Sequence, residues 1–495
     1  MNELGPWLES PNNIPRPNAV IDDLVDATLI DVSEAIRRGG VSSVDVTRAC
    51  LERIDRQQPR LNCFASINAE GALAAAERAD QEFADGTWRG PLHGVPLAHK
   101  DMFYRAGEVS GFGSKICKDY MADETSQVMA RIDAGGAIDL GPLHMTEFAV
   151  GHTGAHEHLG YCRNPWNTDH IPGGSSSGTG TAVAARLIYG SIASDTGGSC
   201  RLPASMCGVV GIKPTYGLVS RHGGMPRAWS LDVFGVYAQN VEDAGLLLEA
   251  IAGEDERDPA TFGTPEFAVD RHAAPDVLGC RIGVPTREAI FQAEPALQPA
   301  LDAALDEFRA LGCEVVEIDF PDLRQIGALS GTVLLAEATA IHDEWTREIP
   351  EQYAEAVVWR LQQGRHIPAT RYLQALRLRP KITESFVSEV YGSVDAVFTP
   401  TITMPVLDFD SAQNFTSEQA PEVIFETTKC TVWANYLGLP AMSVPCGFTP
   451  DALPIGFQLV ARPFDESLLL NLGRAYQSRT EWHRCRPPET DGEPA

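Results

Sequence analysis

The sequence is poor in basic residues and has no long apolar run. Lysine and arginine number 39 against 67 aspartate and glutamate residues, so the formal net charge is -28. A surface of this sign repels phosphate backbones and anionic lipid, so the composition argues against direct binding to nucleic acid or to a membrane surface. Apolar runs such as TAVAARLIYG end too soon to span a bilayer. We therefore expect neither partner.

Paired cysteine motifs and a leader-like start are also missing. The 11 cysteines are scattered and contain no CxxC pair, which argues against a disulfide framework and against a zinc knuckle. We expect reduced and mostly buried thiols. The first residues, MNELGPWLESPNNIP, carry acids and prolines where a signal peptide has basic and then apolar residues. The chain is therefore predicted to be cytoplasmic.

Helix-like and strand-like patterns alternate along the 495 residues. Apolar periodicity predicts amphipathic helices over 42–57 and 69–86, and short apolar runs bounded by glycine predict strands within 94–104 and 135–141. From about 320 to 392 the pattern becomes one of long helices rich in large residues, before further strands and a closing helix. This alternation indicates an α/β protein with a helical insertion or cap at 320–392.

We expect the α/β domain to span residues 29–485. Residues 1–28 are predicted to form an N-terminal extension that buries little, and residues 486–495 to form a flexible tail.

The stretch SIASDTGGSCRLPASMCG places a lone serine, Ser199, in a glycine-rich turn. The apolar lead-in predicts the end of a strand, Gly197 and Gly198 permit a sharp turn, and Pro203 suits the first turn of a helix. Such a loop directs several backbone N–H groups to one point, as an oxyanion hole requires. The alternative is a serine in an ordinary glycine turn.

Two other polar clusters invite a chemical interpretation. Gly174, Ser176 and Gly178 satisfy the G-x-S-x-G pattern of a nucleophile elbow, but the preceding NTDHIP does not resemble the strand that this motif needs. The second cluster contains three histidines in a glycine-flanked segment, and the spacing of two of them is one found in metal sites. Histidines on a loop near a pocket are the favoured alternative. These residues are His152, His156 and His158.

Lys100 lies in the apolar run GVPLAHKDMFY. Its side chain either reaches solvent along the apolar surface or is buried, and burial disfavours the ammonium form. A neutral lysine is a general base.

Together these segments resemble the amidase signature family, whose members hydrolyse amides with two serines and a lysine. The matching segments are GVPLAHKD, PGGSSSGTGTAVAA and SDTGGSCRLPASMCGVVGIKPTYG. Lys100 precedes Ser175 by 75 residues and Ser175 precedes Ser199 by 24, and both intervals are those of the family. The resemblance extends over about residues 29–484 and implies a large mixed, twisted sheet with helices on both faces.

The resemblance implies that Ser199 is the nucleophile, that Ser175 relays protons and that Lys100 is the general base and acid. Backbone N–H groups around Thr196, Gly197 and Gly198, with that of Ser199, would hold the oxyanion. No metal or organic cofactor is required.

Other residues of the motifs are expected to support the site. Ser176 is expected to hydrogen-bond to the relay serine or the lysine, and Asp101 and Asp195 to fix loop N–H groups. Arg201 is expected to be an internal charge partner.

Three positions depart from the usual family pattern. Ser177 replaces a glycine, Thr179 replaces a serine or another small residue, and His156 replaces a common asparagine. These departures prevent a transfer of substrate identity.

Three functions remain open. The favoured one is a stand-alone hydrolase of a small amide, anilide or carbamate, for which we expect a homodimer. The alternative is the glutaminase A subunit of a tRNA-dependent amidotransferase, whose partner subunits would contact the RNA. The third is a non-catalytic scaffold, against which the intact serines and the cost of burying a lysine argue.

Overall fold

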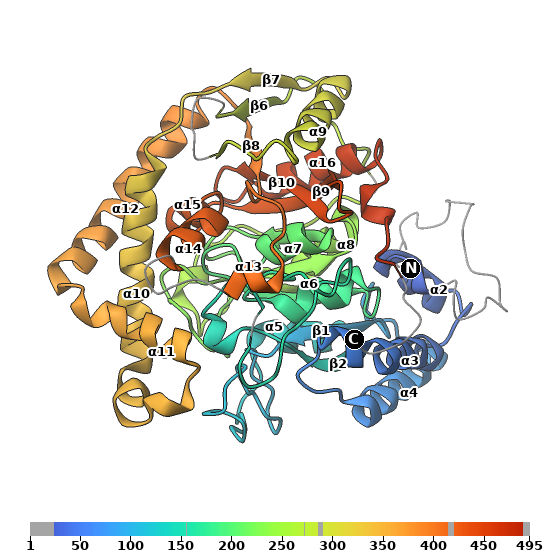
Figure 1. Ribbon diagram of the computed structural model, residues 1–495. Helices are drawn as coiled ribbons and strands as arrows, with labels where there is room; N and C mark the ends of the chain where they lie inside the picture. Colours follow the sequence, from blue (N-terminus) through green and yellow to red (C-terminus); the bar gives the residue numbers. More distant parts are fainter. Residues whose placement is uncertain (1–23, 155, 272, 286–290, 414–419, 489–495) are drawn as a thin grey trace.

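The computed structural model describes residues 24–154, 156–271, 273–285, 291–413 and 420–488. Ten strands form one mixed sheet in the order β2-β1-β3-β5-β4-β9-β10-β8-β6-β7 (Figure 1). The strands are β1 Pro96–Lys100, β2 Ile138–Leu143, β3 Gly190–Asp195, β4 Val210–Lys213, β5 Val233–Ala238, β6 Arg281–Val284, β7 Glu314–Glu317, β8 Ala396–Pro400, β9 Ala441–Phe448 and β10 Pro454–Ala461.

The direction of the strands changes along the sheet. Strands β2, β1 and β3 are parallel at one end, and β8, β6 and β7 are parallel at the other. The strands between them, from β3 through β5, β4, β9 and β10 to β8, pair antiparallel. Because β1 and β3 are parallel neighbours, their carboxyl ends meet at one edge of the sheet. Lys100 and Asp195 end these two strands.

Helices cover both faces of the sheet. Helices α6 and α7 pack together and contact the central strands, and α8 and α16 pack together and also contact central strands. The helices are α2 Leu29–Arg37, α3 Ser43–Leu61, α4 Ala69–Ala84, α5 Gln127–Ala134, α6 Ser177–Ala184, α7 Leu202–Cys207, α8 Val241–Ile251, α9 Gln298–Ala310, α10 Leu323–Glu348, α11 Glu355–Gln362, α12 Ala369–Val390, α13 Phe409–Gln413, α14 Ala420–Thr428, α15 Val432–Leu437 and α16 Glu466–Gln477.

Several strands of the sheet are buried along their whole length. Every residue of β1, β3, β5 and β10 is buried, as expected for strands sandwiched between helical layers. The predicted α/β class with a large mixed sheet is therefore confirmed.

The helical segment predicted at 320–392 contains α10, α11 and α12. Helices α10 and α12 run along one side of the molecule (Figure 1) and both contact α15. Phe320 and Phe386 pack with the buried indole of Trp433, the centroid distances to that ring being 5.3 and 5.5 Å. The helical block thus shares an aromatic core with the α/β body.

The described parts of the two terminal segments contact the rest of the chain. Residues 1–23 and 489–495 lie outside the described residues, but Leu24, assigned to an extension that buries little, is only 4% exposed and belongs to the main core. Its carbonyl accepts a 2.7 Å hydrogen bond from the Tyr189 hydroxyl. At the other end, Arg486 forms an ion pair with Asp26. The two described end segments therefore contact the body and each other.

All eleven cysteines are free thiols, and nine of them are buried, which agrees with the expectation of buried small residues. None of the helices in the described part of the chain is long and apolar enough to cross a membrane.

Candidate active site

Lys100 ends strand β1 and is fully buried. Its Nζ donates to Ser175 Oγ at 2.7 Å and to Ser194 Oγ at 2.9 Å. Desolvation lowers the pKa of Lys100 to about 8, although the charges of Cys200, Asp195 and Asp232 oppose the shift. A lysine with this pKa loses its proton near neutral pH, so it is suited to general-base chemistry.

Ser194 is a contact of the lysine that sequence reasoning missed. It lies in β3, the parallel neighbour of β1, and the register that pairs His99 with Ile192 brings the two strand ends together. The sequence feature that could have indicated this contact is the position of Ser194, directly before Asp195 at the end of the strand. Only the pairing of β1 with β3 reveals which face this serine shares with Lys100.

Ser175 and Ser176 immediately precede α6, which begins at Ser177. The Gly174–Ser175 peptide bond is cis, and the Ser175 carbonyl accepts from Thr146 N at 3.1 Å. Ser176 Oγ donates to the Ser194 carbonyl, on the backbone of β3, at 3.4 Å. The sequence had predicted a hydrogen bond of Ser176 to Lys100 or Ser175 instead.

The nucleophile-elbow interpretation of Gly174, Ser176 and Gly178 lacks its structural context. Residues 171–173 before the motif are not in a strand, whereas an elbow turns from a strand into a helix. Close packing explains why residue 178 is a glycine, because a Cβ there would lie 2.1 Å from the Cys63 carbonyl oxygen.

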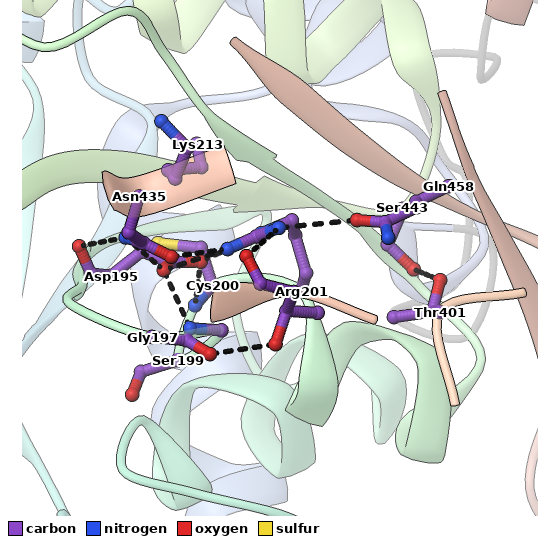
Figure 2. A network of polar contacts seen from close by, with 12 residues as sticks. Asp195, Gly197, Ser199, Cys200, Arg201, Lys213, Thr401, Asn435, Ser443 and Gln458 are labelled. Atoms are coloured by element: carbon purple, nitrogen blue, oxygen red, sulfur yellow. Dashed lines mark hydrogen bonds and ion pairs between the residues drawn. The ribbon is translucent and has the colours of Figure 1, made fainter. Parts of the chain in front are cut away.

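Ser199 lies in the turn between β3 and α7 and is partly exposed. Its hydroxyl points away from the buried network behind the loop (Figure 2). The described contacts join Lys100 to Ser175, but they include no hydrogen bond between the Ser175 and Ser199 hydroxyls. Catalytic hydrogen bonds are often long before substrate binds, so this arrangement is compatible with a serine relay.

Asp195 holds the loop that carries Ser199. Its Oδ1 accepts from Gly198 N at 2.7 Å and its Oδ2 from Cys200 N at 3.0 Å. A fully buried ion pair joins the same carboxylate to Arg201, with Nε 3.0 Å from Oδ2. These contacts agree with the support expected from Asp195 and with the internal charge partnership expected of Arg201.

The buried network continues to the C-terminal part of the chain (Figure 2). Asn435 Nδ2 donates to Asp195 Oδ1 at 2.8 Å, and Arg201 Nη1 donates to Gln458 Oε1 at 3.1 Å. The Thr431 hydroxyl donates to the Gly197 carbonyl at 2.6 Å. Sequence reasoning missed these partners, because they follow Arg201 by more than 200 residues and carry no local motif.

The predicted oxyanion donors are not equivalent in the structure. The Gly198 N–H is already directed to Asp195, so we leave it out of the donor set. Gly198 has a different role: its φ is +138°, and a Cβ there would lie 2.4 Å from Thr431 Oγ1. The N–H groups of Thr196, Gly197 and Ser199 remain as candidates. The Thr196 hydroxyl donates to Asp232 Oδ1 at 2.6 Å.

Asp101 directly follows Lys100 and fixes a second loop. Its two carboxylate oxygens accept from Gly111 N at 3.0 Å and Gly113 N at 3.1 Å. Burial raises the pKa of Asp101 to about 6. This is the supporting role expected for Asp101.

The three candidate metal-binding histidines do not form a metal site. His156 Nδ1 accepts from His158 N and Leu159 N, and its Nε2 contacts the Gly113 carbonyl oxygen, so both ring nitrogens are already used. Desolvation, with a contribution from Arg360, lowers the pKa of His152 to about 3. The described ranges contain no cluster of three or more His, Cys, Asp or Glu residues suited to a metal ion.

Comparisons with known proteins agree with this architecture. A family model described as Amidase matches residues 45–470. The A subunit of the glutamyl-tRNA(Gln) amidotransferase of Azoarcus sp. (strain BH72) is 36% identical over 493 residues, which cover 94% of this chain and 100% of that protein.

Two solved structures are similar along their whole length. A chain from a vestigial protein complex connected with the origins of an s-triazine catabolic enzyme has a TM-score of 0.85 and 32% identity, covering 92% of this chain and 98% of that one. The peptide amidase of Stenotrophomonas maltophilia has a TM-score of 0.80 and 29% identity, covering 94% and 99%. The chain therefore belongs to the amidase signature family and is a hydrolase of carbon–nitrogen bonds.

Proposed function

We propose that the protein hydrolyses a small amide through an acyl-enzyme on Ser199, with Ser175 as proton relay and Lys100 as general base and acid. The observation that carries the proposal is the contact of 2.7 Å between Lys100 Nζ and Ser175 Oγ. This contact joins Ser175 to a buried lysine whose pKa is lowered to about 8. A purely structural role for Ser175 does not require a buried amine beside its hydroxyl.

Each proton has a defined path in this mechanism. Neutral Lys100 takes the Ser175 proton while Ser175 takes the Ser199 proton, and Ser199 Oγ attacks the amide carbonyl carbon. As the carbon–nitrogen bond breaks, Lys100 returns its proton through Ser175 to the leaving nitrogen. Water then attacks the acyl-enzyme, with the same residues taking its proton, and releases the acid and free Ser199.

The developing oxyanion needs fixed donors. We assign this role to the N–H groups of Thr196, Gly197 and Ser199, because Asp195 and Thr431 hold the loop that carries them. The loss of one such donor costs about 3 to 4 kcal/mol of transition-state stabilisation in serine hydrolases. The rigid support of the loop therefore has a catalytic purpose.

A stand-alone hydrolase of an amide, anilide or carbamate is the first candidate. The second is a glutaminase A subunit of a tRNA-dependent amidotransferase, which the 36% identity to the Azoarcus protein over 94% of this chain favours. A screen of amides, anilides, carbamates and glutamine on the isolated chain separates them. Ammonia release from glutamine that requires added partner subunits would favour the second candidate. The homodimer and the cytoplasmic location stay predictions.

A fluorophosphonate probe tests the nucleophile. We expect labelling of Ser199 with loss of turnover, and a Ser199→Ala variant that folds normally and is inert. Turnover in the wild type is expected to survive EDTA, because no proton transfer in the relay uses a Lewis acid. Labelling of Ser176 would overturn the assignment, as would an EDTA-inactivated enzyme that zinc restores.

A further inference from the structure

Tyr237 in β5 contacts the turn that carries Ser199. The residue is fully buried, and its hydroxyl donates to the Ser199 carbonyl oxygen at 2.7 Å. Strand β5 pairs antiparallel with β3, which ends directly before this turn, and the register places Tyr237 opposite Ser191. A side chain from the neighbouring strand thus holds the backbone of the proposed nucleophile.

The peptide group between Ser199 and Cys200 is held at both ends. Its carbonyl accepts from Tyr237, and its N–H donates to Asp195 Oδ2 at 3.0 Å. The C=O and N–H of a trans peptide lie in one plane and point in opposite directions. Two contacts on opposite sides therefore fix the rotation of this plane, and Tyr237 supplies the one that Asp195 does not.

The peptide group before Ser199 is fixed as well. The Gly198 carbonyl accepts from Arg201 N at 2.8 Å and from Leu202 N at 2.7 Å. The Ser199 N–H at the other end of that peptide points the opposite way, and no hydrogen bond among the described residues engages it. The Cα of Ser199 therefore joins two fixed planes, so the side chain that carries the hydroxyl leaves the backbone in a fixed direction.

The Tyr237 hydroxyl also meets the second catalytic loop. The side chain of Ser176, the residue after the proposed relay Ser175, interacts with this hydroxyl. A phenol oxygen both donates and accepts, so one hydroxyl serves both loops. Burial raises the pKa of Tyr237 well above its usual value, with the charges of Cys200 and Asp195 adding to the shift. The phenol therefore keeps its proton and remains a donor at neutral pH.

A tyrosine at this position has a requirement that a phenylalanine would not have. A buried hydroxyl needs a hydrogen-bond partner, whereas the ring alone packs into an apolar core. We propose that Tyr237 is a positioning residue: its hydroxyl holds the Ser199–Cys200 peptide so that the Ser199 hydroxyl and N–H are directed to the substrate carbonyl. The inference rests on the proposed function of Ser199.

Tyr237→Phe removes the hydroxyl and keeps the ring. We expect kcat for the amide that the substrate screen identifies to fall about tenfold or more, because the Ser199 carbonyl loses a hydrogen bond inside the protein. KM should stay nearly unchanged. Labelling of Ser199 by a fluorophosphonate should slow by a similar factor, since attack on phosphorus uses the same side-chain direction. The pH profile should keep its midpoint, because the contacts of Lys100 are not altered.

Tyr189→Phe is the matched control. The Tyr189 hydroxyl is also buried and donates to a backbone carbonyl at 2.7 Å, but that carbonyl belongs to Leu24 near the start of the described chain. Both variants should lower the thermal midpoint through the loss of one such hydrogen bond, and Tyr189→Phe should keep the wild-type kcat and labelling rate. Equal losses of kcat in the two variants, or wild-type rates in Tyr237→Phe, would overturn the proposal.

A second variant covers the case in which Tyr237→Phe does not fold. Incorporation of 4-aminophenylalanine at position 237 keeps the ring and offers an amine, a weaker donor, to the same carbonyl. This variant should lower kcat and the labelling rate by a smaller factor, with KM unchanged. Wild-type rates in it would overturn the proposal.

The behaviour of Ser199 separates this inference from the proposed function. If a fluorophosphonate does not label Ser199 and Ser199→Ala still turns over, the proposed function fails and the positioning role fails with it. If Ser199 is labelled and Ser199→Ala is inert, but Tyr237→Phe keeps the wild-type kcat, the function stands and only the role of Tyr237 is overturned.

Discussion

Lys100 Nζ lies 2.9 Å from Ser194 Oγ, across two parallel strands. This contact gives the amine a second hydroxyl beside Ser175 and fixes its direction. Ser194→Ala removes the contact from a buried site, and the loss of one such hydrogen bond is about 1 kcal/mol. We therefore expect kcat to fall about tenfold or less with KM nearly unchanged. A variant whose kcat equals that of the wild type would show that Ser175 alone orients the lysine.

The leaving group distinguishes a catalytic from a structural Lys100. An amine must be protonated as it leaves, whereas an alkoxide or phenoxide needs less help, so Lys100 acts twice on an amide. Lys100→Ala should lower kcat/KM for an amide more than for its matching ester. The wild-type rate should also fall as the pH drops below about 8, the pKa of Lys100. Equal losses for both substrates, with a flat pH profile, would remove Lys100 from the mechanism.

Burial of Lys100 predicts a pH-dependent cost in stability. Its pKa is about 8 in the folded protein, below the ordinary lysine value of 10.5, so between these values the unfolded chain binds more protons and stability rises with pH. Below pH 8 the burial of the charged Lys100 lowers the free energy of unfolding by its full amount, about 3 kcal/mol. Lys100→Met should thus gain stability relative to wild type at pH 7, and the gain should shrink by pH 10. Thermal midpoints across this range measure it; a difference independent of pH would contradict the assignment.

Two glycines in helices should respond oppositely to alanine. Gly178 in α6 would bring a Cβ within 2.1 Å of the Cys63 carbonyl and 2.6 Å of His144 N, whereas Gly327 in α10 has nothing within 4 Å. Gly178→Ala should therefore lower the thermal midpoint strongly. Gly327→Ala should raise stability by about 0.5–1 kcal/mol through helix propensity. A tolerated Gly178→Ala would show that the Cys63 loop moves freely.

Local patterns in the sequence predicted much of the fold. The predicted strand segments at 94–104 and 135–141 contain β1 and the first part of β2, and the pattern at 69–86 contains α4. The cap of α3 depends on tertiary contacts: Ser42 Oγ accepts from Asp45 N and caps the helix, while Ser43 Oγ donates to the Gly94 carbonyl. Two neighbouring serines are equal candidates for a cap until tertiary contacts engage one of them.

The candidate active site was also predicted only in part from the sequence. The spacing of Lys100, Ser175 and Ser199 is visible along the chain, and the structure joins the first two directly. Ser194 and Asn435 were not predicted, because their roles depend on which strands pair and on which helix packs behind a loop.

The dependence of the Ser199 loop on Asn435 and Gln458 has a consequence for biosynthesis. A ribosome makes the N-terminal part first, and domains begin to fold as they emerge. The turn that carries Ser199 is complete long before β10, yet Arg201 obtains its Gln458 partner only from that strand. The nascent chain thus lacks the contacts of Asn435 and Gln458 behind its nucleophile loop until nearly all of the polypeptide has been made. We therefore expect hydrolytic activity only when synthesis is almost finished.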